Sequence, residues 1–207
     1  MDTQHPTDAI LVEALFRVIA EHGWRGVTLS RLAAASGLSS AVLVRRFPSR
    51  LGLLRVFVDH VTTQVAQGTV PGQGGTPRDR LFDVLMRGLD AMAPHKSGVK
   101  RLMSDMVTDG VLTGAMLPLF RHAMERMLDA AEIDSGGLHG RLRAFGLGLV
   151  WLRVVNAWSK DGTEELGPTM ATLDRALERA EQAAHSFGLA HGDLAARGEV
   201  GTEGTQV

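Results

Sequence analysis

The side chains best suited to chemistry are six arginines in an acid-free window of the sequence. Between Glu21 and Asp59 there is no aspartate or glutamate, and the window holds Arg25, Arg31, Arg45, Arg46, Arg50 and Arg55. From Asp161 to the C-terminus, nine acids stand against three arginines. Guanidinium groups bind phosphate, so this asymmetry favours a polyanionic partner for the N-terminal end. A solvated basic face without a partner fits the charges equally well.

Other chemistry is poorly represented. There is no cysteine, which excludes disulfides, thiol nucleophiles and cysteine-ligated zinc. The eight histidines are scattered, and their one local cluster with an acid, His185, His191 and Asp193, lies near the C-terminal end. No zinc-protease, serine-hydrolase or phosphate-loop motif is present. We therefore expect no cofactor and no metal, and we expect that the protein is not an enzyme.

The composition indicates a globular protein without a membrane partner. The 207 residues are 44% hydrophobic and 22% charged, with a formal net charge of −1, which suits one domain or a small domain fused to a larger one. The N-terminus lacks the basic and apolar regions of a signal peptide. The most apolar window, 144–152, is too short to span a bilayer. We expect a cytoplasmic protein.

The elements that must position the arginines are predicted to be helices throughout, and the fold class to be all-α. Apolar periodicity and capping residues predict short helices after Thr28 and after Ser39 or Ser40, and longer ones at 8–22, 48–67, 78–93, 98–108, 113–131, from 138 onward and at 166–187. Four glycines and two prolines mark 68–77 as a linker. The expected domains are therefore 1–67 and 78–187, followed by a disordered tail at 188–207.

Residues 28–50 have the mechanics of a helix-turn-helix. Ala33 is small where the two helices would cross, and Gly37 supplies the sharp turn. The core of the three-helix unit would contain Leu32, Leu38, Leu43 and Phe47. The second short helix would present to a major groove Ser40, Ala41, Val44 and Arg45. Arg46 and Arg50 can neutralise flanking phosphates.

A longer pattern covers about residues 10–61. Its parts are Gly23–Thr28, Leu32-Ala33, Gly37-Leu38-Ser39, Leu43, Phe47-Pro48-Ser49-Arg50 and Leu53-Leu54. This combination resembles the TetR/AcrR family of bacterial transcriptional regulators. The resemblance implies an N-terminal DNA-binding domain and a C-terminal ligand-binding and dimerisation domain. It also implies phosphate contacts by Thr28, Ser39, Arg46 and Arg50, and contacts to base edges by Ser40, Ala41, Val42 and Arg45.

The sequence departs from that family at Val44, where tyrosine is usual. The lost hydroxyl removes a contact of roughly 0.5–1.5 kcal/mol, which Arg45 and Arg46 can offset because a bidentate arginine–guanine contact contributes about 1–3 kcal/mol of discrimination. Alternatively, DNA binding has been lost: the run from Trp158 to Arg175 also looks like the ubiquinone-biosynthesis lipid-binding family, which shares the fold. The acid-free arginine window favours the regulator.

Methionines gather in the middle of the chain, where seven of the nine lie between Met86 and Met127. Flexible thioethers suit a pocket for varied apolar ligands, although ordinary core packing explains them as well. Since the resemblance implies an effector site in this region, the candidate lining is Met86, Leu102, Met103, Met106, Met116, Phe120, Met124, Met127 and Trp151. Arg101, Asp105 and Asp109 share one helical face and are interpreted as a solvated charge stripe rather than a ligand clamp.

Two apolar seams lie in the last two predicted helices. Their members recur in alternating steps of four and three, the spacing of a helix–helix seam: Leu138, Leu142, Phe145, Leu149 and Leu152, then Leu166, Met170, Leu173, Leu177, Ala180 and Ala184. The first helix has a second apolar stripe through Trp151 and Trp158, so it must be covered on two sides. We expect the seams to form a homodimer interface; the alternative is the central core helix of a monomer.

These features together predict a homodimeric, ligand-responsive regulator, most simply a repressor. It would bind a palindromic operator in double-stranded DNA and be released by a small apolar effector. The alternative function is a lipid- or isoprenoid-binding protein of the same fold that does not bind DNA.

Overall fold

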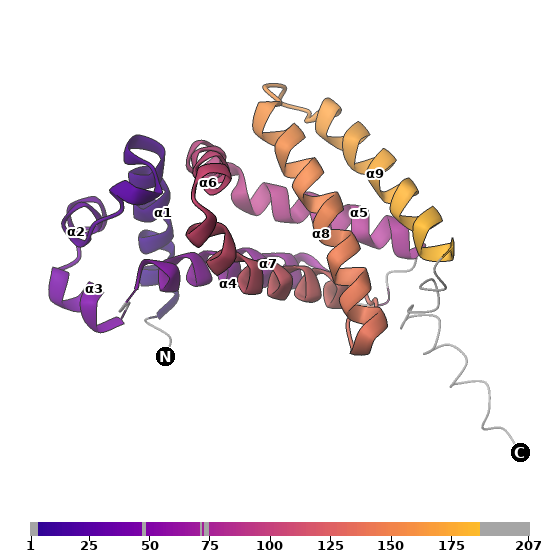
Figure 1. Ribbon diagram of the computed structural model, residues 1–207, viewed down its shortest axis with the longest axis horizontal. Coiled ribbons are helices and arrows are strands. Elements are labelled where there is room, and N and C mark those ends of the chain that lie inside the picture. The colour runs from indigo at the N-terminus through magenta and orange to yellow at the C-terminus, as the bar shows by residue number, and fades with distance from the viewer. Residues whose placement is uncertain (1–3, 47–48, 71, 73–74, 187–207) are drawn as a thin grey trace, which may run out of the picture. The chain divides into compact units, whose positions relative to one another are not determined.

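The computed structural model describes residues 4–46, 49–70, 72 and 75–186, and this part of the chain is helical without strands (Figure 1). The all-α prediction is therefore confirmed. The elements are α1 (Gln4–His22), η1 (Trp24–Gly26), α2 (Leu29–Ser36), α3 (Ser40–Arg46), α4 (Arg50–Gly68), α5 (Pro77–Met92), η2 (Ala93–His95), α6 (Lys96–Thr108), α7 (Gly110–Ala130), α8 (Gly137–Lys160) and α9 (Gly167–Ser186). No helix among the described residues is both long enough and apolar enough to cross a membrane.

Most helix ends lie within two residues of the predicted positions, but α1 begins at Gln4 rather than at residue 8, and α7 also begins early. The apolar pattern predicts a start near Thr113, but the helix begins at Gly110. The Asp109 carboxylate accepts a hydrogen bond from the Leu112 amide at 3.0 Å, so it satisfies a free N–H of the first turn. Because the cap lies before two residues that lack strong helix propensity, the periodicity alone starts the helix one turn too late.

The chain divides into two compact units whose limits differ from the expected domains. The first unit contains Met1–Val61 and Met92–Leu119, and the second contains Thr62–Ala91 and Phe120–Val207. The N-terminal helices thus share a unit with α6, which follows the expected linker by some twenty residues. The expected tail at 188–207 lies outside the described residues.

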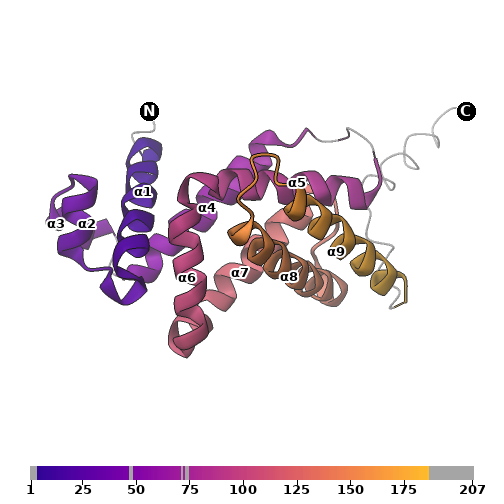
Figure 2. The same ribbon diagram turned by 90° about the horizontal axis from the view of Figure 1, so that it is seen from above.

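The first unit is built on close packing between α1 and α6, which lie side by side in Figure 2. Gly98 on α6 makes this approach possible, because a Cβ there would lie 2.5 Å from the Phe16 carbonyl oxygen. The Phe16 ring contacts Phe57 of α4 at 4.3 Å between centroids and stacks on His95 at 5.4 Å. Burial lowers the pKa of His95, and the charge of His60 adds to that effect.

The second unit contains the α8–α9 pair, whose two helices lie next to each other in Figure 1. Trp158 of α8 and Leu173 of α9 are fully buried. The connection between the helices is held by Asp161, which is also buried. One carboxylate oxygen accepts bonds from the amide and hydroxyl of Thr163, and the other accepts bonds from those of Thr169. The carboxylate therefore fixes the start of α9.

Candidate nucleic-acid interface

Helices α2 and α3 form the predicted helix-turn-helix. The Thr28 hydroxyl accepts a hydrogen bond from the Arg31 amide at 3.3 Å and so caps α2. Gly37 ends α2 in the left-handed conformation, with φ 70°, which a residue with a Cβ adopts only at a cost. Leu32 and Leu43 are buried as predicted and Leu38 is half-buried. Phe47 lies outside the described residues.

One face of α3 is open to solvent. Ser40, Ala41, Val44 and Arg45 are exposed on it, and 52% of Val44 is accessible. Val42 is half-buried, so it is turned further toward the interior than a residue facing base edges would be. Arg46 is the last residue of the helix, and its side chain is not among those described.

The hydroxyls of Thr28 and Ser39 both lie at helix starts. Ser39 Oγ accepts a bond from the Val42 amide at 3.4 Å and caps α3, as the Thr28 hydroxyl caps α2. In each case the oxygen acts as acceptor, which leaves the hydroxyl hydrogen as a donor. Each group therefore has a donor that can bond a phosphate oxygen next to a helix N-terminus.

Arg50 has partners that its sequence position does not suggest. Its guanidinium lies over the Trp24 ring, 5.3 Å from the centroid, and Nη1 donates to the Trp24 carbonyl oxygen at 3.3 Å. The two residues are 26 positions apart, so no local periodicity signals the contact. The contacts of Arg50 with Trp24 therefore compete with the phosphate contact that was expected of this side chain.

The other arginines of the acid-free window also differ in their surroundings. Arg31 donates to the Gly26 carbonyl at 2.9 Å, Arg25 pairs with Asp109 at 3.4 Å and Arg55 pairs with Asp59 at 3.8 Å. Arg45, on the exposed face of α3, has no ion pair within the described part of the chain. Among the described arginines between Glu21 and Asp59, Arg45 is therefore the best placed to bind an external anion.

Arg101 is 49% exposed and fits the interpretation as a solvated charge stripe, but Asp105 and Asp109 do not. Asp105 Oδ2 accepts a bond from the Trp24 amide at 2.6 Å, while Oδ1 accepts one from Arg101. Asp109 contacts Arg25 and caps α7, and these bonds lower the pKa of Asp109. The acids of α6 and of the following turn thus contact the residues next to the helix-turn-helix.

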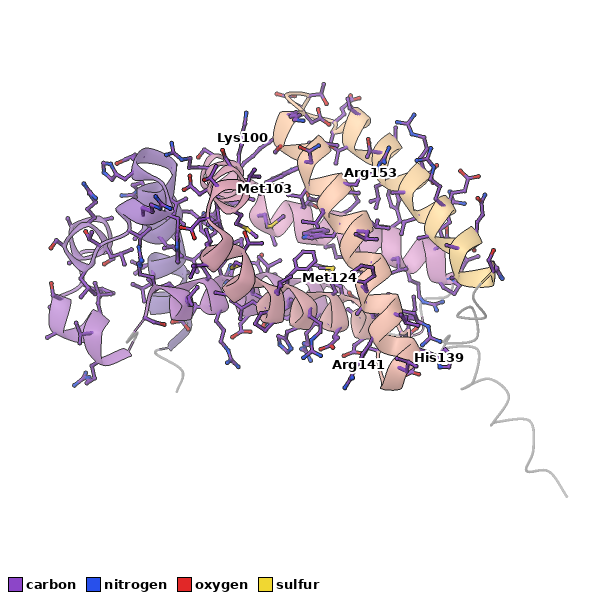
Figure 3. The ribbon with its side chains drawn as sticks, in the orientation of Figure 1. Lys100, Met103, Met124, His139, Arg141 and Arg153 are labelled. Atoms are coloured by element: carbon purple, nitrogen blue, oxygen red, sulfur yellow. The ribbon has the colours of Figure 1, made fainter. Side chains whose placement is uncertain are left out.

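The candidate effector residues are distributed over both units. Leu102, Met103, Met106 and Met116 belong to the first, and Met86, Phe120, Met124, Met127 and Trp151 to the second. Met124, Met127 and Trp151 are buried, while Figure 3 labels Met103 on α6 and Met124 on α7. A Cβ on Gly88 would meet Trp151 at 2.9 Å and Met127 at 3.1 Å. This close packing supports core filling by Met127 and Trp151.

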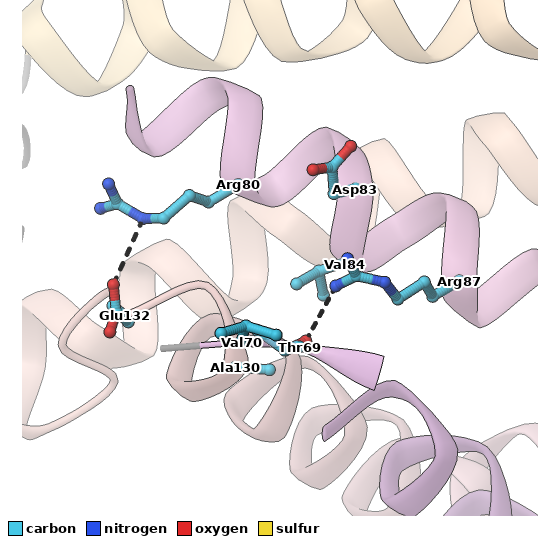
Figure 4. A pocket seen from close by; sticks show the side chains of 8 residues that line it. All are labelled: Thr69, Val70, Arg80, Asp83, Val84, Arg87, Ala130 and Glu132. Atoms are coloured by element: carbon cyan, nitrogen blue, oxygen red, sulfur yellow. Dashed lines mark hydrogen bonds and ion pairs between the residues drawn. The ribbon is translucent and has the colours of Figure 1, made fainter. Parts of the chain in front are cut away.

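A small hollow in the second unit is lined by none of these methionines. It measures about 40 Å³ and is lined by Thr69, Val70, Arg80, Asp83, Val84, Arg87, Ala130 and Glu132 (Figure 4). Arg87 donates to the Thr69 hydroxyl at 3.0 Å, and Arg80 lies 4.0 Å from the Glu132 carboxylate. A drug-sized ligand needs a pocket of roughly 300 Å³ or more, so this hollow does not fit the predicted effector.

The two predicted seams have different surroundings. The α8 members form an exposed apolar row, with accessible fractions of 70% for Leu138, 48% for Leu142, 69% for Phe145, 58% for Leu149 and 48% for Leu152. On α9, Leu173 and Leu177 are buried within the chain, which removes them from the expected interface. Met170 is 36% exposed, and Leu166, Ala180 and Ala184 are half-buried. The two α9 leucines were misassigned because a four-three spacing does not distinguish an internal seam from an external one.

The chain matches a family model and curated relatives. Residues 11–56 match the model described as bacterial regulatory proteins, tetR family. The chain is 26% identical over 149 residues to uncharacterized HTH-type transcriptional regulators of Mycobacterium tuberculosis and Mycobacterium bovis. The match covers 66% of this chain and 70% of each relative. The matched segment contains η1, α2 and α3 in full.

Solved structures share the fold. A TetR transcriptional regulator from Nitrosomonas europaea gives a TM-score of 0.67 at 16% identity, covering 86% of this chain and 99% of its own. A TetR transcriptional regulator from Rhodococcus sp. RHA1 gives 0.56 at 18% identity, with 86% and 97% covered. NalD, the secondary repressor of the MexAB-OprM multidrug efflux pump in Pseudomonas aeruginosa, gives 0.52 at 16% identity, with 86% and 97% covered. The chain therefore has the fold of TetR-family transcriptional regulators, and its residues 11–56 match the model of that family.

Proposed function

We propose that this protein regulates transcription by binding double-stranded DNA through α3. The observation that carries the proposal is the exposed face of that helix, which presents Arg45 beside Ser40 and Ala41, with no ion-pair partner for Arg45 among the described residues. An arginine on a helix in the major groove reads guanine with two hydrogen bonds. The small neighbours allow a close approach to the bases, and the capped helix starts supply phosphate contacts.

The proposed binding form is a homodimer. The apolar row of α8, formed by Leu138, Leu142, Phe145, Leu149 and Leu152, is continuous along one helix and open to solvent. Exposed apolar rows of this size are uncommon on monomers and mark association surfaces. A second copy would cover the row symmetrically, and two α3 helices would then occupy half-sites of a palindrome, roughly 34–36 Å or a multiple of that distance apart.

The proposed action is repression that a small apolar effector relieves. The abundance of methionine between Met86 and Met127 supports an adaptable apolar site. An effector that binds the DNA-free form more tightly shifts the population away from DNA in proportion to that difference in affinity. No catalytic constellation is part of this proposal.

The proposal is tested by selecting bound duplexes from random DNA with the purified full chain. We expect enrichment of a palindromic sequence. Arg45→Ala should relax the base preference at one position of each half-site by about 1–3 kcal/mol, whereas Arg17→Ala, which removes an exposed α1 side chain paired with Glu13, should leave the selected sequence unchanged. Equal loss of affinity for operator and random DNA in Arg45→Ala would argue against base readout by that residue.

A chain that selects no duplex and instead co-purifies with an isoprenoid would contradict DNA binding. That result would favour the lipid-binding alternative of the same fold. The exposed, apolar Val44 in the middle of α3 makes the comparison necessary, because a valine offers no hydrogen bond to DNA.

A further inference from the structure

The main chain of Trp24 is held on both sides by charged side chains from other helices. Its N–H donates to Asp105 Oδ2 of α6 at 2.6 Å. Its carbonyl oxygen accepts a bond from Arg50 Nη1, the first residue of α4, at 3.3 Å. The Arg50 guanidinium also covers the Trp24 ring at 5.3 Å, and the ring is buried. We call Asp105, Trp24 and Arg50 the Trp24 junction.

The junction lies where the chain turns from α1 into the helix-turn-helix. Gly23 precedes it with φ 68°, and a Cβ at that position would lie 2.9 Å from both Arg101 Nη2 and Asp105 Oδ2. The positive φ favours glycine here, and a Cβ would displace the α6 side chains that hold Trp24. Trp24 begins η1, which leads directly into Thr28 and α2. Arg50 begins the helix that follows α3.

The bonds of the junction are of a strong kind. A carboxylate that accepts from a backbone N–H at 2.6 Å forms a short charge-assisted hydrogen bond. The Asp105 side chain is 21% exposed, so water competes weakly for it. Arg101 holds the second carboxylate oxygen at 3.1 Å from the preceding turn of α6. The carboxylate is therefore oriented before it meets the Trp24 amide.

We infer that Asp105 and Arg50 are positioning residues for DNA binding, acting through Trp24 rather than through contact with DNA. The inference rests on the proposed function. The junction fixes the two ends of the segment that contains α2 and α3, since Trp24 precedes α2 and Arg50 follows α3. Asp105 thereby ties the orientation of the recognition helix to α6. Arg50 is exposed, but its guanidinium is oriented by the Trp24 carbonyl oxygen and ring.

The first test measures the affinity of the full chain for its selected duplex. Without the Asp105 bond, a smaller fraction of molecules holds α2 and α3 in the orientation that binds DNA. If that fraction falls tenfold, the apparent affinity for DNA falls tenfold as well. We expect Asp105→Ala to bind about tenfold more weakly. Asp105→Asn keeps an oxygen that can accept from the amide and should stay within about threefold of wild type. Equal weakening by both variants, or by neither, would overturn the role of Asp105.

The second test separates positioning by Arg50 from phosphate contact. Removing a phosphate contact lowers the slope of log affinity against log salt by about one. Arg50→Met removes the guanidinium but keeps an unbranched side chain, and we expect weaker binding with an unchanged slope. A slope reduced by about one would overturn the assignment of Arg50. Arg17→Ala serves as the control, since it removes an exposed arginine of the same unit outside the junction.

The third test needs no DNA. Hydrogen exchange at the Trp24 amide should be slow in wild type and in Asp105→Asn and fast in Asp105→Ala, because only the last loses the acceptor. Unchanged protection in Asp105→Ala would overturn the junction itself. Operators with half-sites moved by one base pair give a further readout: Asp105→Ala should discriminate less among them, which a mere loss of folded protein would not produce.

The outcomes distinguish this inference from the proposed function. If wild type selects no duplex, DNA binding fails and the positioning role fails with it. If wild type binds a selected duplex and Asp105→Ala binds it equally well, only the positioning role fails. Asp105→Ala and Arg50→Met act on one residue, so their effects should combine to less than their product. A double variant with fully multiplicative losses would contradict action through Trp24.

Discussion

At the scale of single residues, the Asp161 carboxylate depends on hydroxyl and amide donors rather than on a cation. Thr163 and Thr169 together donate four hydrogen bonds to it, at 2.6–3.0 Å. Hydrogen bonds to the charged form, first of all those from the hydroxyls of Thr169 and Thr163, hold the pKa of Asp161 far below its usual range. The carboxylate therefore stays ionised in the folded protein at acid pH.

This lowered pKa makes a prediction about stability in acid. An aspartate in the unfolded chain titrates near pH 4. Below that pH the carboxyl is protonated in the unfolded state but stays ionised in the folded state. The contribution of Asp161 is fully present above about pH 4 and is lost as the pH falls toward the folded-state pKa. Asp161→Asn should lower the melting temperature by several degrees at pH 7 and by less near pH 3. Glu164→Gln, an exposed change in the same connection, should have no effect in either melting curve.

The sequence predicted part of the candidate site. The part that it did not predict consists of contacts between residues far apart in the chain. Ser40, Ala41 and Arg45 could be placed on the outer face of α3 because helical periodicity is a local property. The bond between Trp24 and Asp105 joins residues 81 positions apart. Charges spaced by four on a helix are common on solvated faces, and nothing in that spacing shows which backbone lies against them.

At the scale of elements, the closeness of α1 and α6 depends on one missing side chain. Gly98→Ala would bring a methyl group to 2.5 Å from the Phe16 carbonyl oxygen and 2.8 Å from its ring. The helices would have to separate, and we expect a loss of about 1–3 kcal/mol in the free energy of unfolding. Gly114→Ala is the matched control, since it lies within α7 with open space around its Cβ. Gly114→Ala should raise the free energy of unfolding, measured by urea denaturation, by up to about 1 kcal/mol. If it instead lowered that free energy as much as Gly98→Ala does, the packing argument would be contradicted.

Helix caps made the element boundaries near the candidate site predictable. Thr28 and Gly37 bound α2 as expected, because a capping hydroxyl and a left-handed glycine act within one turn. The grouping of α6 with the N-terminal helices was not predictable in the same way. The glycine-rich stretch at 68–77 suggests a domain boundary, but the close fit of Gly98 against Phe16 is a tertiary contact and leaves no sign in the local sequence.

At the scale of the whole molecule, the exposed apolar row of α8 leads to a prediction about assembly. Phe145 lies in the middle of the row and is 69% exposed. Phe145→Arg places a charge where two copies would meet, and its burial without a partner is strongly unfavourable. We expect sedimentation to show a dimer for wild type and a monomer for the variant at micromolar concentration, together with weaker DNA binding.

Leu117→Arg is the control for that substitution. Leu117 is 62% exposed on α7 and is outside the row. It should leave the sedimentation coefficient of the dimer unchanged. A wild-type monomer, or a Phe145→Arg variant that remains a dimer, would show that the row serves another purpose.

The 81-residue span between Trp24 and Asp105 has a consequence for synthesis of the chain. When the ribosome has made the first four helices, the Trp24 amide still lacks its carboxylate, and α1 still lacks the helix that packs against Phe16. Translation must proceed through α6 before either is supplied. A fragment that stops at Gly68 would therefore carry every residue assigned to base contact and yet lack the partners that hold its turn, which makes it a poor substitute for the full chain in binding assays.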